Sequence, residues 1–368
     1  MALAKRAFIA GGSITSFIGK GHPDFIWKRH PDFGKKENPT WEEFLQQAVD
    51  ELITQTGLNP EDVDRLYLGN FTGELFVNQG HMGAGLVGTH PAFANKPSMR
   101  VEGACASGGL AIMAGLDAIA AGADIVLVAG VEVQTTVSAR EGGDFLARAS
   151  HYSRQRGIDD FTFPALFGRR AKEYCGAFGV TAEEIDTVAV KAYGNANKNP
   201  KAHMKAAKMD AETAASSFKF LSNEEYKPFV KVSDCSQVSD GASAMLLVSE
   251  AGLAKLGKVE SDVAEIIGRG HSVASLYADG DLTKLTTSAD AVSKAYNDAG
   301  VTAGEINVAE VHDCFAVTEC MMYEAAGFAP VGEGAKLAAS GETGINGKIP
   351  VNTGGGLIGF GHPVYTVS

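Results

Sequence analysis

Apolar residues along this chain follow two different periods, and the changes of period divide it into elements. Short aliphatic runs predict buried strands, and they stand at residues 7–10, 65–70, 98–102, 123–130 and 240–249. Thr40-Trp41-Glu42-Glu43 is a capping box that opens an amphipathic helix, and Gly57 is expected to end it. A further short helix is expected within residues 80–90. Strands that alternate with helices in this way predict an α/β fold.

A second alternating series follows in the last third of the chain. It predicts a strand at 263–270, a helix at 287–299, a strand at 306–311 and a helix at 318–326. In both series a helix is followed by a similar turn, at 57–64 and again at 300–307, so a duplicated βαβαβ half is the simplest interpretation. A similar turn sequence recurs at 179–186, within the intervening stretch. Part of the similarity between the two series is therefore common to helix ends in general.

The stretch between the two series breaks the alternation. Residues 133–230 are more polar and carry most of the basic side chains, so we interpret them as an excursion from the layered core. The expected organisation is a first half made of residues 1–132 and 231–255, an inserted domain of residues 133–230, and a second half of residues 256–368.

Composition and charge narrow the classes of protein. The chain has 368 residues, 45% of them hydrophobic and 21% charged, which is ordinary for a globular protein of two domains. The net charge of −12 argues against nucleic acid as a partner. We expect no membrane span and no secretory signal. The five cysteines do not suggest a disulfide framework and indicate a reducing compartment.

Candidate chemistry is concentrated at one cysteine. Cys105 lies where the strand at 98–102 turns into a helix that is apolar on every side, and Gly122 is expected to cap that helix. Backbone N–H groups at a helix N-terminus favour a thiolate, so we expect a lowered pKa for Cys105 and interpret it as a nucleophile. On placement alone, a buried structural cysteine is an equally good interpretation.

Two other groups follow predicted strand ends. They are His312-Asp313-Cys314-Phe315, directly after the strand at 306–311, and the glycine-rich run 352–363 that contains His362. Ligands of open α/β sheets bind beyond the carboxyl ends of strands, so the three groups can converge. The glycine-rich run lacks the Gly-Lys-Ser/Thr ending of a phosphate loop. No Cys/His spacing in the chain fits a metal site, so none is expected.

These motifs, in this order, resemble the thiolase superfamily. Cys-Ala-Ser-Gly-Gly at 105–109, His-Asp-Cys-Phe at 312–315 and Gly-His-Pro at 361–363 carry the resemblance. The second motif is similar to that of sterol-carrier-protein-type thiolases, as are the runs at 161–167 and 197–203. The resemblance implies a five-layered αβαβα fold with two βαβαβ halves and an inserted loop domain.

The resemblance also implies roles for four side chains. Cys105 would take an acyl group from an acyl-CoA, and His362 would be the base that activates it. Cys314, with a modestly lowered pKa, would be the second acid/base, acting on the α-carbon of acetyl-CoA. His312 would hold, through a water molecule, the thioester oxygen of the incoming CoA ester as it becomes an enolate, and the Cys105 N–H would help to bind the oxyanion of the acyl group. Cys175, Cys235 and Cys320 are interpreted as structural.

Substrates and partners are implied in the same way. The resemblance implies acetyl-CoA and 3-ketoacyl-CoA as substrates, no cofactor beyond these thioesters, a role in lipid metabolism such as fatty-acid β-oxidation, and a homodimer or homotetramer. The protein would be intracellular: cytoplasmic in a prokaryote, peroxisomal or mitochondrial in a eukaryote. The phosphates of CoA would meet basic residues of the insertion, namely Arg169, Arg170, Lys172, Lys191, Lys201, Lys205 and Lys208.

The sequence departs from the family pattern after His362. Thiolases continue Gly-His-Pro with a glycine-containing helix start, which Tyr365-Thr366-Val367-Ser368 does not match. The internal repeat makes the same point, because one helix and two strands of the second half are missing. The second half is therefore expected to be incomplete. A second oxyanion donor would then be lacking, and weak or no activity is expected, since one such donor contributes about 10²–10³ in rate.

Three functions remain open on the sequence. The first is a CoA-dependent acyltransferase of the thiolase class, by Claisen condensation or thiolytic cleavage. The second is a retro-aldolase acting on a CoA thioester; the retention of both Cys105 and Cys314 speaks against it. The third is a non-catalytic protein that binds acyl-CoA or lipid.

Overall fold

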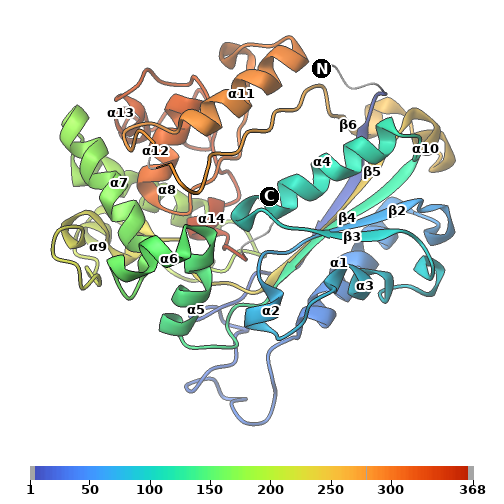
Figure 1. Ribbon diagram of the computed structural model, residues 1–368, viewed down its shortest axis with the longest axis horizontal. Helices are drawn as coiled ribbons and strands as arrows, with labels where there is room; N and C mark the ends of the chain where they lie inside the picture. Colours follow the sequence, from blue (N-terminus) through green and yellow to red (C-terminus); the bar gives the residue numbers. More distant parts are fainter. Residues whose placement is uncertain (1–4, 279, 364–368) are drawn as a thin grey trace.

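A six-stranded mixed sheet forms the centre of the first half of the molecule (Figure 1). The computed structural model describes residues 5–278 and 280–363. The strand order is β3-β2-β4-β5-β1-β6. The strands are β1 (Phe8–Ile14), β2 (Arg65–Gly69), β3 (Ser98–Val101), β4 (Ile125–Glu132), β5 (Gly241–Val248) and β6 (Ala264–Glu265). Strand β2 runs parallel to both β3 and β4, whereas β5 is antiparallel to β4 and β1.

One long helix covers each face of this sheet. Helix α1 (Trp41–Thr56) packs on β1, β4 and β5, and α4 (Ser107–Ala120) packs on the opposite face over β2 and β4. All residues of β4 are buried, with alternate side chains entering the core beneath α1 and the core beneath α4. A strand covered on both faces reads as a continuous apolar run, which is the pattern found at 123–130.

The expected helix after Thr40 has the predicted ends. Thr40 accepts from the Glu43 N–H, and the Glu43 carboxylate accepts from the Thr40 N–H, which completes the capping box. Gly57 takes the left-handed conformation, with φ of 68°, at the other end. The predicted short helix is α3 (Met82–Val87).

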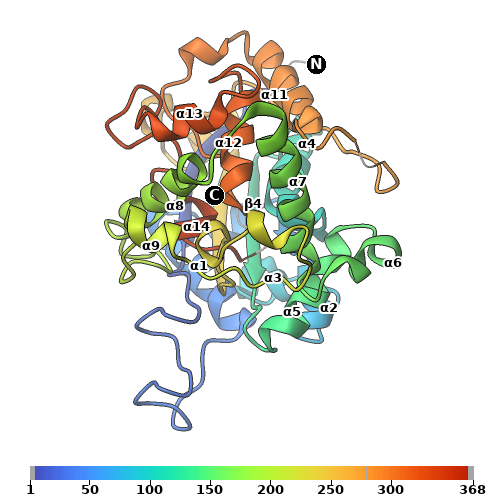
Figure 2. The same ribbon diagram turned by 90° about the vertical axis from the view of Figure 1, so that its left-hand side faces the viewer.

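Helices dominate the rest of the chain. Residues 133–230 contribute α5 to α9 and no strand of the sheet, and α8 packs against the last helices of the chain. A second apolar core lies among α7, α8, α12, α13 and α14. The remaining helices are α2 (Gly73–Phe76), α5 (Ala139–Leu146), α6 (Tyr152–Gln155), α7 (Thr162–Phe178), α8 (Ala182–Ala196), α9 (Ala211–Ala215), α10 (Glu250–Lys255), α11 (Thr286–Ala299), α12 (Ala316–Ala325), α13 (Gly334–Ala339) and α14 (Gly356–Gly359). The loop before α1 projects away from the body (Figure 2).

Two predicted strands of the second series differ from expectation. Only Ala264–Glu265 pairs with β1, because the chain beyond it passes close to the backbone of α11 at Gly268 and Gly270. Residues 306–311 are extended but form only one bridge among the described residues, between Ala309 and Val351, and so make no ladder. In contrast, β1 does not end at Gly11; it continues through a bulge to Ile14.

The helix after Cys105 is less buried than its apolar sequence predicts. One side of α4 lies on the sheet, including Ala111, Leu116 and Ile119, whereas Ile112 and Met113 on the other side are only half-buried. The helix ends at Ala120, and the positive φ of 114° at Gly122 follows it.

The described chain ends at Pro363. The expectation about 364–368 therefore lies outside the described residues. Among the described helices, none is both long and apolar enough to cross a membrane.

Two glycines bring the start of α4 against the end of β2. A Cβ on Gly69 would lie 2.9 Å from the backbone of Gly108, closer than real Cβ atoms approach. The position of the turn that carries Cys105 therefore depends on the missing side chain at residue 69.

Gly69→Ala should destabilise the protein by about 1–3 kcal/mol, because the added methyl must push α4 away from the sheet. Urea unfolding measures this change. Gly194→Ala is the matched control: it lies on the exposed face of α8 with nothing within 4 Å of the new Cβ. Removing a helical glycine there should stabilise by about 0.5–1 kcal/mol. Equal effects of the two substitutions would contradict the close-packing argument.

Candidate active site

Cys105 lies in a single 3-10 turn, Ala104–Ala106, between β3 and the first residue of α4. Ala104 has a φ of 50°, a left-handed conformation that a non-glycine residue rarely adopts. The hydroxyl of Ser107 holds the turn, because it donates to the Ala104 carbonyl at 2.7 Å and accepts from the Gly103 N–H at 3.1 Å. The strand-to-helix junction predicted for Cys105 is confirmed, and it is a strained one.

His312 follows the extended segment 306–311, and buried polar side chains fix that segment. Asn352 accepts from the Val311 N–H at 2.8 Å through its side-chain oxygen. The carboxylate of Asp313 accepts from the Leu357 N–H at 2.6 Å and from the Ile358 N–H at 3.3 Å, at the start of α14. Asp313 thereby joins the loop of His312 to the glycine-rich segment that leads to His362.

His362 is held on three sides. Its N–H donates to Ser239 Oγ at 3.2 Å, and its carbonyl accepts from the Gln134 side chain at 2.8 Å. Ser236 Oγ lies 2.9 Å from His362 Nδ1. When Nδ1 carries the proton and donates to Ser236, Nε2 is left as an acceptor, the state that a base requires.

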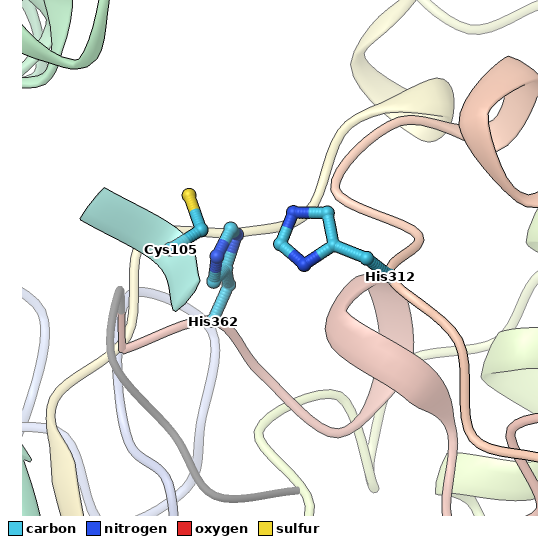
Figure 3. Close-up of side chains that lie close together, drawn as sticks. All are labelled: Cys105, His312 and His362. Carbon is cyan, nitrogen blue, oxygen red and sulfur yellow. The ribbon is translucent and has the colours of Figure 1, made fainter. Parts of the chain in front are cut away.

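The three side chains converge at one point (Figure 3). One ligand atom from each of Cys105, His312 and His362 lies within 4.8 Å of the others. The two imidazole rings meet edge to face, with centroids 5.4 Å apart and planes at 80°. Residues from two halves of the sequence are thus brought together, although His362 follows the short helix α14 and not the end of a strand as predicted.

Cys314 is buried beside this cluster. Only 3% of its surface is exposed, and its carbonyl accepts from the Ser236 N–H at 2.9 Å. Its thiol interacts electrostatically with that of Cys105. Residues 235–238 contact both motifs, because Cys235 bridges Phe315 and Val238 bridges His362.

The pKa of Cys105 is shifted upward, opposite to the lowered pKa that its sequence position predicts. Burial raises the pKa of its thiol to about 12, and the backbone N–H at the turn lowers it by less. The Glu132 carboxyl adds to the increase in pKa. Desolvation of the thiolate therefore outweighs the helix N-terminus, and Cys105 is a neutral thiol in the free protein.

The neighbouring groups are also kept uncharged. Burial lowers the pKa of His312 to about 4, and it lowers the pKa of His362 well below the ordinary range, with His312 adding to the effect. Burial raises the pKa of Cys314, with Cys105 the next cause, so the modestly lowered value expected for it is wrong. At neutral pH the site holds two thiols and two neutral imidazoles.

A buried polar network supports the loop from below. Glu319 is fully buried; its carboxylate contacts the Lys191 ammonium and the Tyr323 hydroxyl and accepts from Asn352 Nδ2 at 2.8 Å. Lys191 is therefore paired with Glu319 and half-buried rather than free for a CoA phosphate, which corrects the sequence-based expectation. Lys172 and Lys201 are also paired with carboxylates, at 2.7 and 2.8 Å.

Two arginines of the insertion border an open space. A cavity of about 230 Å³ is lined by Arg169, Arg170 and Phe167, together with Leu282 from the second half. Arg170 donates to the Leu282 carbonyl at 3.0 Å, and burial lowers its pKa. Phe167 stacks on Phe315, next to Cys314 in sequence, with ring centroids 4.3 Å apart.

Sequence reasoning missed the residues that hold the site together. The sequence motifs assign no role to Asp313, although it lies within the His-Asp-Cys-Phe run. They also assign none to Asn352, which begins the glycine-rich run. The run Asp234-Cys235-Ser236-Gln237-Val238-Ser239 contains the two serines that fix His362, and its hydroxyls directly before a buried strand were the available signal.

Family models, curated proteins and solved structures all include matches to this chain. The family model described as "Thiolase, N-terminal domain" matches residues 31–251, and "Thiolase C-terminal domain-like" matches residues 268–367. The acetyl-CoA acetyltransferase of Methanothermobacter thermautotrophicus is 33% identical over 329 residues, 88% of this chain and 82% of that protein. Sterol carrier protein 2 of Homo sapiens is 31% identical over 206 residues, 55% of this chain and 36% of that protein. A solved structure titled "Ltp2-ChsH2(DUF35) aldolase" has a TM-score of 0.77 at 22% identity, covering 99% of this chain and 87% of that chain, and confirms the α/β fold.

Alkylation of Cys105 in the free protein should speed up with pH without reaching a plateau. With a thiol pKa of about 12, the thiolate fraction rises about tenfold per pH unit between roughly pH 7 and 10. Iodoacetamide labelling followed by peptide mass mapping measures the rate at this cysteine alone. A plateau near neutral pH would instead reveal a thiolate–imidazolium pair, and the neutral-site description would be wrong.

Proposed function

This chain belongs to the thiolase superfamily, and from that premise we propose that it transfers acyl groups between CoA thioesters through an acyl-enzyme on Cys105. The observation that carries the proposal is the convergence of Cys105, His312 and His362 within 4.8 Å. A thiol, a neutral imidazole in reach of it and a second hydrogen-bond donor are the groups that acyl transfer requires.

The first step uses Cys105 and His362. His362 Nε2 takes the proton of the thiol as the sulfur attacks the thioester carbonyl of an acyl-CoA. The tetrahedral intermediate then expels the CoA sulfur, which receives that proton from His362. A neutral thiol and a neutral imidazole are the states that this step starts from, and the pKa directions of both groups favour them.

Stabilisation of charge falls to His312 and to the backbone at the helix start. A neutral imidazole has one N–H to donate, and His312 stays neutral because burial lowers its pKa to about 4. It would donate to the thioester oxygen of the second substrate as that oxygen becomes an enolate. The Cys105 N–H would face the oxyanion of the acyl group attached to the same residue.

Cys314 has the properties of an acid for the carbon–carbon step. In thiolysis, Cys105 attacks the 3-keto carbon of a 3-ketoacyl-CoA, the bond between C2 and C3 breaks, and C2 takes a proton. Cys314 holds its proton at neutral pH because burial raises the pKa of its thiol. It lies beside Cys105, so it would supply that proton, and in condensation it would accept one.

The insertion would bind the rest of CoA. We assign this role to residues 133–230, with Arg169 and Arg170 at the cavity as the phosphate-binding candidates. A guanidinium keeps its charge when partly buried and can form two parallel hydrogen bonds with a phosphate, which is the chemistry that this role needs.

Acetyl-CoA should leave one acetyl group on Cys105, detectable by intact-protein and peptide mass spectrometry after acid quench. Cys105→Ala should abolish this adduct, because the nucleophilic sulfur is gone. His362→Ala should slow its formation by about 10²–10⁴-fold, through loss of the base. Cys175→Ser is the matched control; Cys175 is half-buried on α7 and is not a member of the Cys105–His312–His362 cluster, so its loss should leave the adduct unchanged.

If no acetyl adduct forms on Cys105, two further measurements would distinguish the competing functions. Saturable binding of acetyl-CoA with no adduct would favour a non-catalytic acyl-CoA-binding protein. Cleavage of a 3-hydroxyacyl-CoA without an adduct on Cys105 would favour the retro-aldolase. Either outcome would overturn acyl transfer through Cys105.

Cys314→Ala should separate the two half-reactions. The variant should still acetylate Cys105 and exchange acetyl groups with CoA, because that step uses His362. It should lose thiolysis of acetoacetyl-CoA by about 10²–10⁴-fold, since no group remains to protonate C2. Equal losses in both assays would show that Cys314 supports the fold rather than proton transfer. The control for that effect is Cys320→Ala, which removes a different buried cysteine, within α12.

A further inference from the structure

The thiol and the two imidazoles that converge at the site are also the ligand types of zinc centres. Cys105 Sγ and one nitrogen from each of His312 and His362 lie within 4.8 Å of one another. A tetrahedral zinc ion with such ligands needs separations between ligand atoms of about 3.4–3.6 Å. Contraction of roughly 1 Å by rotation of the three side chains would reach that geometry.

Hydrogen bonding leaves these groups available. Among the described residues, the ring of His312 has no hydrogen-bond partner and meets the ring of His362 edge to face, while Cys105 Sγ is bonded only by the backbone N–H of its own residue. His362 is bound through Nδ1 to Ser236 Oγ at 2.9 Å, which leaves Nε2 toward the cluster. A ligating histidine whose second nitrogen donates to a neighbouring oxygen is the usual outer-shell arrangement of metal sites.

The donor types decide which cation fits the cluster. The neighbouring carboxyl of Glu132 is buried, and burial raises its pKa to about 8, so it is largely protonated at neutral pH and adds no fixed charge. No oxygen ligand belongs to the cluster itself, so magnesium and calcium are disfavoured, whereas a thiolate with two imidazoles matches zinc.

We propose that Cys105, His312 and His362 form a three-ligand site for one zinc ion, with a water or a substrate oxygen in the fourth position. Binding releases the thiol proton to solvent as the sulfur–zinc bond forms, and CoA thioesters then find no free nucleophile. Zinc would act as a reversible inhibitor that competes with acyl-CoA. The inhibitory part rests on the proposed acyl transfer, whereas the binding of zinc does not.

Metal titration of the full 368-residue protein tests the site without reference to turnover. Calorimetry with zinc chloride should show one ion per chain, and cobalt(II) should give a thiolate-to-metal charge-transfer band. Cys105→Ala should remove the band and weaken zinc binding at least ~tenfold, and His312→Ala and His362→Ala should each weaken it at least ~tenfold. Cys175→Ser should bind as the unmodified protein does, and magnesium chloride should give no signal.

A measurement on the unmodified chain covers the case in which a variant fails to fold. Zinc should slow iodoacetamide labelling of Cys105 but not of Cys175, and a chelator should restore the rate. Unprotected Cys105, or zinc binding that survives Cys105→Ala unchanged, would overturn the proposal. Acyl transfer with no zinc binding would refute this site alone; zinc binding with no acyl-enzyme would refute the proposed function alone.

Discussion

The buried carboxylate of Asp313 is the contact on which the arrangement of the site depends. Its two bonds from the backbone at the start of α14 connect the loop of His312 to the glycine-rich segment of His362. A Cβ on Gly356 would lie 2.2 Å from this carboxylate, so glycine is needed for the approach. Burial raises the pKa of Asp313, as does Glu319 nearby, and the two N–H donors oppose that increase. Loss of this contact would leave His362 held by Ser236, Ser239 and Gln134.

Low charge is the second constraint that the packing imposes. Both thiols and both imidazoles are desolvated, so each is kept in its neutral form. Neutral groups lose little hydration free energy when an uncharged thioester displaces water from them. The thiols can donate protons and the imidazoles can accept them. The same three side chains offer the ligand types of a zinc centre once the Cys105 thiol has lost its proton, so the proposed acyl transfer and the proposed zinc binding would use one arrangement and would exclude each other at Cys105.

The sequence predicted local structure well where near neighbours decide it. The capping box at Thr40, the stop at Gly57 and the strand predicted from the apolar run at 123–130 each depend on residues within a few positions, and all three are confirmed. The strand expected at 306–311 was wrong because a strand needs a partner along its length, and only Ala309 finds one among the described residues. The sequence of α4 is apolar on every side and so favours burial all round, yet only the side on the sheet is completely buried.

The sequence by itself determined the α/β class, through its alternating strand and helix patterns. It also determined the family resemblance, through three motifs whose order can be read along the chain. It also placed Cys105 at a strand-to-helix junction. Only the tertiary structure decided that Cys105, His312 and His362 meet, that Lys191 is paired with Glu319, and that the pKa of Cys105 is raised. The reason is physical: helix ends and periodicity are set by neighbours along the chain, whereas desolvation and ligand distances depend on atoms that distant segments bring together.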